Sequence, residues 1–123
     1  MRQRVRGLTI ILAAPDGERM RAALTLAAAN AALGGRARLF CQNETVRLLA
    51  DLRAPEDAVH ECAGLPTLAR LFDEALGLGV EIIACQSGLH LAGIAADTLD
   101  PRIAFGGPMS VMQTLGEDRL VMA

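Results

Sequence analysis

The sequence contains no lysine, no tryptophan and no tyrosine, and it has only three phenylalanines. Without lysine, the chain can form neither a Schiff base with a carbonyl substrate nor the lysine-dependent phosphate loop of many nucleotide-binding proteins. The shortage of aromatic rings leaves little for nucleic-acid bases to stack on. Because 12 arginines face 14 acidic residues, the net charge is −2, and no basic run stands out. These properties argue against a general nucleic-acid binder.

Long hydrophobic runs are also absent. A membrane-spanning helix needs about 20 consecutive apolar residues, and the nearest approach, residues 22–33, is interrupted by Thr25 and Asn30. The basic start of the chain and the apolar residues 8–14 after it resemble a signal peptide. The apolar part is short and leads directly into a charged turn, which favours a first strand instead. We therefore expect no membrane span.

Cysteine and histidine are too scattered to suggest a metal site or a disulfide framework. The three cysteines form no CxxC pair and the two histidines no HExxH motif, whereas a metal site needs three or four converging ligands. We expect no metal, no cofactor and a cytoplasmic location. The carboxylates fall mainly on predicted helix faces and turns, where exposure to solvent is enough to explain charged side chains. No acid–base pair can therefore be nominated. Solvation also explains the basic leader, which consists of Arg2, Arg4 and Arg6.

Apolar runs rich in β-branched residues alternate with helical stretches along the chain, and 52% of the residues are apolar. The pattern predicts strands at 8–14, 36–41, 80–84, 103–105 and 119–122. Helices are predicted at 18–33, 44–52, 67–78, 87–99 and 110–115, with one long loop at 53–65. Because no linker or repeat interrupts this order, residues 1–123 form a single domain. The alternation predicts a three-layer α/β/α sandwich with a mostly parallel five-stranded sheet.

In sheets of this kind, binding sites form where the carboxyl ends of strands meet helix N-termini. Four loops qualify, and their candidate binding residues are Asp16, Gly17, Asn43, Gln86, Ser87, Gly88, Gly106 and Gly107. The two glycine-containing turns at 16–17 and 106–107 could each meet a phosphate. Neither forms a dinucleotide-binding or phosphate-loop motif, so nucleotide binding is only weakly indicated.

Cys85 is the strongest candidate for chemistry, at the last position of the predicted central strand and just before a helix. Unpaired N–H groups at a helix N-terminus favour the thiolate, which is the nucleophilic form. Ser87 and the backbone amides of residues 86–88 could hold a charged sulfur species. The alternative is that Cys85 is a small buried hydrophobe, as most free cysteines are.

The other cysteines and His90 have weaker claims. Cys41 also ends a strand, but with a strand between them the two thiols would lie ~10 Å apart, too far for a disulfide without movement. A filler at the strand end is the better interpretation of Cys41. Cys62 lies in the long loop, where it is either a relay thiol or incidental. His90 follows Cys85 by five residues, and its participation stays open.

The order of motifs resembles the DsrE/DsrF-like family over essentially the whole chain. An Asp-Gly-Glu turn at 16–18 precedes an alanine-rich helix that ends at Gly34-Gly35, and a strand then runs into Phe40. The more diagnostic match is Gly-Val-Glu-Ile-Ile-Ala-Cys at 79–85, followed by Leu89 and Gly93-Ile94. The Gly106-Gly107 turn and the short helix before the last strand also fit.

The resemblance implies a three-layer fold, assembly into homotrimers or homohexamers, and sulfur relay between a donor and an acceptor protein. The persulfide-carrying role falls on Cys85 alone. A rival hypothesis is an oligomeric module that binds a small anion or nucleotide at the Gly17 and Gly106-Gly107 loops, with a passive thiol. A third is a thiol redox protein in which Cys85 forms a sulfenic acid or pairs with Cys41 or Cys62.

Overall fold

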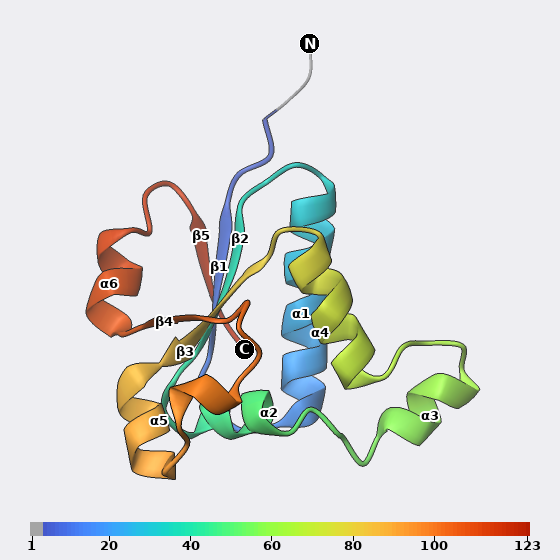
Figure 1. Ribbon diagram of the computed structural model, residues 1–123. Helices are drawn as coiled ribbons and strands as arrows, with labels where there is room; N and C mark the ends of the chain where they lie inside the picture. Colours follow the sequence, from blue (N-terminus) through green and yellow to red (C-terminus); the bar gives the residue numbers. More distant parts are fainter. Residues whose placement is uncertain (1–3) are drawn as a thin grey trace.

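The computed structural model describes residues 4–123, so Arg2 lies outside the described part. Within that part, five parallel strands form one sheet in the order β4-β3-β2-β1-β5 (Figure 1). The strands are β1 (Leu8–Leu12), β2 (Ala37–Cys41), β3 (Glu81–Cys85), β4 (Ala104–Gly106) and β5 (Arg119–Met122). The sheet is therefore parallel throughout rather than mostly parallel, and β3 lies second from one edge rather than at the centre.

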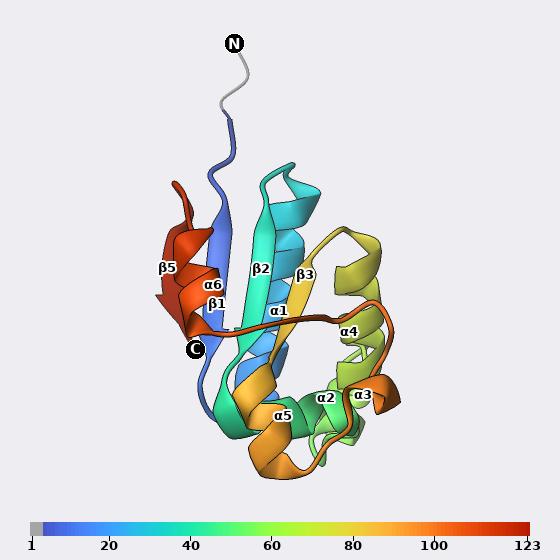
Figure 2. The same cartoon turned by 60° about the vertical axis from the view of Figure 1, so that its left-hand side comes forward.

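Helices cover both faces of the sheet, which confirms the predicted three-layer arrangement. They are α1 (Gly17–Ala32), α2 (Val46–Ala50), α3 (Asp57–Cys62), α4 (Leu68–Gly77), α5 (Gln86–Ala92) and α6 (Pro108–Gln113), with 3₁₀ turns η1 (Asn43–Thr45) and η2 (Ala96–Thr98). α1 and α4 pack together on one face and α6 lies on the other (Figure 1). Figure 2 shows β5, β1, β2 and β3 side by side, with α5 and α2 beyond the carboxyl ends of the strands.

α1 forms where the sequence predicts it, and its start is capped by a side chain. The Asp16 carboxylate accepts hydrogen bonds from the backbone N–H groups of Glu18 and Arg19, at 2.9 and 3.1 Å. Met20 and Leu24 are completely buried on the side facing the sheet. In the described chain, no helix combines the length and apolar character that a bilayer crossing requires.

Two parts of the predicted helix pattern are wrong: a helix forms in the expected loop at 53–65, and the helix expected at 87–99 is shorter than predicted. The expected loop at 53–65 contains α3, which has no buried residue and so shows no apolar periodicity. The Asp57 carboxylate anchors this segment by accepting hydrogen bonds from the backbone N–H of Leu68 and from Arg21. The N–H of Leu68 is also the main cause of the lowered pKa of Asp57. The helix expected at 87–99 ends early, because Gly93 adopts a left-handed conformation with φ of 68°.

A buried ionic network joins the sheet to the segment around α6, near the amino ends of the strands. Arg38 on β2 is 3% exposed, and its Nε donates to the Thr9 hydroxyl at 3.0 Å. Its Nη1 donates to the Thr114 hydroxyl at 2.7 Å and its Nη2 to the Val111 carbonyl at 3.2 Å. The network corrects the expectation that solvation accounts for the carboxylates, since Asp118 is its counter-ion.

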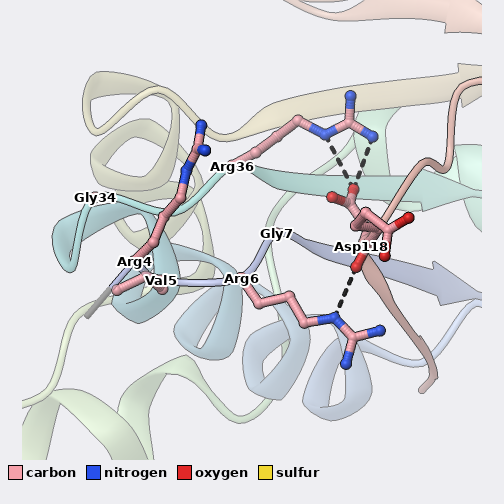
Figure 3. A pocket seen from close by; sticks show the side chains of 8 residues that line it. Arg4, Val5, Arg6, Gly7, Gly34, Arg36 and Asp118 are labelled. Atoms are coloured by element: carbon pink, nitrogen blue, oxygen red, sulfur yellow. Dashed lines mark hydrogen bonds and ion pairs between the residues drawn. The ribbon is translucent and has the colours of Figure 1, made fainter.

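Asp118 receives hydrogen bonds from Arg36 and from Thr9, each at 2.8 Å, and lies 3.8 Å from the Nε of Arg38. Burial disfavours its charged form, but these bonds and the arginine charges outweigh burial and lower the pKa of Asp118. Figure 3 shows the Arg36 guanidinium hydrogen-bonded to the Asp118 carboxylate. Arg6 donates a hydrogen bond to the neighbouring Glu117 carbonyl. The network thus connects the segment that precedes β5 with strands β1 and β2.

Candidate functional site

Most of the predicted site residues gather at the carboxyl edge of β3 and β4. Cys85 ends β3 and is the register partner of Gly106 at the end of β4. The chain turns directly from Cys85 into α5, so residues 86–88 form the first turn of that helix. Gln86 and Ser87 are exposed there. The structure thus brings five predicted positions, from two loops, to one place.

The Cys85 side chain caps α5. Its Sγ accepts a hydrogen bond from the backbone N–H of Gly88 at 3.4 Å, so one of the unpaired N–H groups at the helix start is directed at sulfur. The side chain is 1% exposed. A backbone N–H aimed at sulfur stabilises negative charge there, and a partner thiol reaches the sulfur only if the covering residues move.

Gly88 and Asn43 meet in a close backbone contact that joins the β2 loop to α5. A Cβ atom at position 88 would overlap the carbonyl oxygen of Asn43. Asn43 has a left-handed backbone with φ of 52°, a conformation that asparagine tolerates better than most residues. Sequence reasoning placed both residues in the candidate site but missed this contact, since Gly88 only weakened the helix prediction.

Asp16 and Gly17 belong to a different part of the carboxyl edge. They follow β1, which β2 separates from β3. The Asp16 carboxylate already satisfies two N–H groups of α1, and Gly17 lies next to the Ala54 side chain. A phosphate at the start of α1 would therefore have to compete with Asp16.

Gly107 precedes α6, whose first residue, Pro108, has no N–H to offer a ligand. The N–H of Gly107 donates to the Ser110 hydroxyl at 3.1 Å, and that hydroxyl donates back to the Gly107 carbonyl at 3.0 Å. The N–H and the carbonyl of Gly107 are thus both satisfied within the loop.

Cys41 lies on β2, directly beside β3, so no strand intervenes between the two strand-end thiols. Its register partner is Ala84, and alternation along the strands directs Cys41 and Cys85 to opposite faces of the sheet. Complete burial raises the pKa of Cys41 to about 12. Cys62 is exposed, and all three cysteines are free. In residues 4–123, no group of three or more potential ligands could hold a metal ion.

A cavity of about 390 Å3 opens beside α5. It is lined by Gln86, Leu89, His90, Ile94, Ala96 and Phe105. His90, left open by the sequence, thus lines a hollow next to the candidate cysteine. A second cavity, of about 540 Å3, lies at the amino ends of the strands between Arg4, Arg6, Arg36 and Asp118 (Figure 3). Of these two cavities, the hollow beside α5 is the nearer to the candidate cysteine, because Gln86 and Leu89 of α5 line it.

The three cysteines are expected to react with iodoacetamide in the order Cys62, Cys85, Cys41. Cys62 is exposed, whereas Cys41 is 0% exposed. Burial also raises the pKa of Cys41 to about 12, so its thiol stays neutral at pH 7 and reacts slowly. Quenched alkylation followed by peptide mass spectrometry measures the three rates. Labelling of Cys41 as fast as that of Cys85 would contradict the distinction between the two strand-end thiols.

The all-parallel five-stranded sheet flanked by helices defines a small α/β protein with the DsrE-like fold. Two solved structures share it. A protein of unknown function, MTH1491 from Methanobacterium thermoautotrophicum, aligns with a TM-score of 0.69 and 14% identity over 96% of this chain and 99% of its own. The ychN protein from E. coli aligns with a TM-score of 0.68 and 18% identity over 95% and 99%.

At these identities the two neighbours show the fold and nothing about activity. Searches against protein-family models and against curated protein sequences found no match. The fold expected from the resemblance is thus supported, while sulfur relay stays a proposal.

Proposed function

We propose that this protein is a sulfur carrier that holds a persulfide on Cys85. The observation that supports this most is the position of its Sγ, which caps α5 and accepts the Gly88 N–H at 3.4 Å. An N–H group aimed at sulfur stabilises both the thiolate that attacks and the persulfide anion that forms. The other strand-end thiol, Cys41, is held in its neutral form by burial, which raises its pKa to about 12.

The proposed reaction is two successive thiol exchanges without net oxidation. The Cys85 thiolate attacks the outer sulfur of a donor persulfide R–S–SH, the S–S bond of the donor breaks, and R–S⁻ leaves. The outer sulfur is then held as Cys85–S–SH. An acceptor thiolate attacks that same sulfur, and Cys85 leaves as its thiolate. The carrier is thereby returned to its starting state.

Transfer requires partner proteins that can reach a thiol that is only 1% exposed. We propose that donor and acceptor dock over the cavity beside α5, where Gln86 and His90 lie at the rim and Leu89 is buried below. Docking there would have to move the side chains that cover the sulfur while leaving the Gly88 N–H in place on it.

Self-association is the second partner proposal, as a homotrimer or homohexamer. The C-terminal part of the chain exposes large apolar side chains on β4, α6 and β5, which in a monomer would be left in water. They are Phe105, Met109, Met112, Leu120 and Met122. Burying them between copies of the chain would remove this exposure.

Cyanolysis tests the proposed function. The Cys62→Ser variant, which lacks the exposed thiol, is incubated with a sulfane-sulfur donor, desalted and treated with cyanide, and the thiocyanate released is measured. We expect about one thiocyanate per chain, and none when Cys85→Ser is added to the same background. The Cys62→Ser/Cys41→Ser variant is the matched control and should load normally. Equal loading with and without Cys85 would refute the proposal.

A further inference from the structure

A small cavity of about 210 Å3 lies between the sheet and α6, separate from the hollow beside α5 except for a shared Phe105. Its walls come from β2, β3, β4 and the α6 segment. They are Arg38, Glu81, Ile83, Phe105, Gly106, Ser110, Val111 and Thr114. Ligand pockets for drug-sized molecules occupy about 300–1,000 Å3, so only a much smaller molecule fits here.

Arg38 supplies a buried cation to this cavity. Its guanidinium carries five N–H groups, and within the described chain three of them are used, by Thr9, Thr114 and the Val111 carbonyl. One N–H on each of Nη1 and Nη2 is left for a ligand. Its nearest carboxylate, Asp118, lies on the Nε side at 3.8 Å and is shared with Arg36.

Glu81 supplies an opposite charge to the same cavity. It is the register partner of Arg38 across β2 and β3, and opposite charges at such positions usually pair directly. Within residues 4–123, the ion pairs closer than 4.0 Å that involve Arg38 do not include Glu81. Glu81 is exposed. Burial lowers the pKa of Arg38, and the charge of Glu81 opposes that lowering in part. The two charges thus lie close together without being in contact.

The remaining walls are apolar. Ile83 is 5% exposed and Val111 2% exposed, and Phe105 closes one side. The hydroxyls of Ser110 and Thr114 already donate to backbone carbonyls, at 3.0 and 2.7 Å. The cavity therefore offers a ligand one cation with two donors, one carboxylate and an aliphatic surface.

We infer that this cavity binds a small zwitterion, namely an α-amino acid with a short aliphatic side chain. Its carboxylate would accept the two remaining N–H groups of Arg38, its ammonium group would pair with Glu81, and its side chain would lie on Ile83 and Val111. This binding is independent of Cys85 and of sulfur transfer.

Three matched ligands test the inference on the ¹⁵N-labelled full chain by NMR titration. L-Valine carries both charges, 3-methylbutanoate lacks the ammonium group, and 2-methylpropylamine lacks the carboxylate. We expect L-valine to shift the amides of Glu81, Ile83, Gly106 and Val111, and both analogues to bind at least about tenfold more weakly.

The Glu81→Gln variant is chosen because the side chain is exposed and Arg38 keeps its partners. It should weaken L-valine at least about tenfold and leave 3-methylbutanoate unchanged or slightly tighter. The inference is overturned if L-valine leaves the cavity amides unshifted at millimolar concentration. It is also overturned if 3-methylbutanoate binds wild type as tightly as L-valine, or if Glu81→Gln binds L-valine as wild type does.

Discussion

Replacing Asp118 by Asn is expected to lower the free energy of unfolding by about 3 kcal/mol, because it removes one partner from a buried ionic network. The carboxylate side chain is 9% exposed, and Arg38 beside it is 4% exposed. The amide oxygen that replaces Oδ2 can still accept from Thr9 and Arg36, but it carries no charge and so cannot neutralise Arg38. Urea unfolding followed by circular dichroism measures the loss.

The pH dependence of stability provides a second measurement on the same variant. The pKa of Asp118 is lowered in the folded state, so the unfolded chain binds the proton first as the pH falls. This group therefore stabilises the fold above its ordinary pKa of 3.8, and the stabilisation is lost as the pH falls from there through the folded value. The Asp118→Asn variant should show a shallower loss of stability over that acid range.

Asp51→Asn is the matched control, because Asp51 also binds an arginine but at the surface. Asp51 Oδ2 lies 3.0 Å from Arg53 Nη2, and the two side chains are 55% and 90% exposed. Exposed pairs of this kind contribute little, and no measurable change in unfolding is expected. If Asp118→Asn proves as harmless as this control, the network does not hold the fold together.

Gly88→Ala is the second substitution with a large expected effect, a loss of about 3 kcal/mol of stability. The added Cβ would overlap the Asn43 carbonyl oxygen. Because this carbonyl belongs to the backbone, the overlap is relieved only if η1 and α5 move apart. Separation would also uncover the Cys85 side chain, which is 1% exposed in the folded protein. We therefore expect faster alkylation of Cys85 in this variant, together with the lower unfolding midpoint.

Gly77→Ala serves as its control, because a Cβ there meets nothing within 4 Å. At the end of α4, alanine should stabilise by about 0.5 kcal/mol through the unfolded state. Cys85 should then react at the wild-type rate. Equal stability of the Gly88 and Gly77 variants would mean that α5 and η1 do not touch as described.

The sequence predicts the order of strands and helices well, because strands buried on both faces read as continuous apolar runs. The buried strand β2 begins one residue later than the pattern places it. The edge strand β5 is largely exposed and still begins and ends at the predicted residues. α3 escaped prediction, since its stability comes from the Asp57 carboxylate bonding Leu68 and Arg21 rather than from an apolar face. Long-range polar contacts of this kind leave no periodicity.

The candidate site was only partly predictable for the same reason. The end of an apolar strand followed by a helix is a local signal, and it led to Cys85. The contact of Gly88 with Asn43 and the side-by-side placement of β2 and β3 depend on strand order, which the sequence pattern leaves open. Nothing in the sequence pattern marks Arg38, and only the fold brings Thr9 and Asp118 to it.

Intact-protein mass spectrometry after incubation with a sulfane-sulfur donor tests the central claim most directly. The protein is the Cys62→Ser variant, with and without Cys85→Ser, and unfolding curves establish that both are folded. The account predicts a gain of one sulfur atom that a reductant reverses, only in the variant that keeps Cys85. A gain of the same size in the variant without Cys85, or no gain in either, would contradict it.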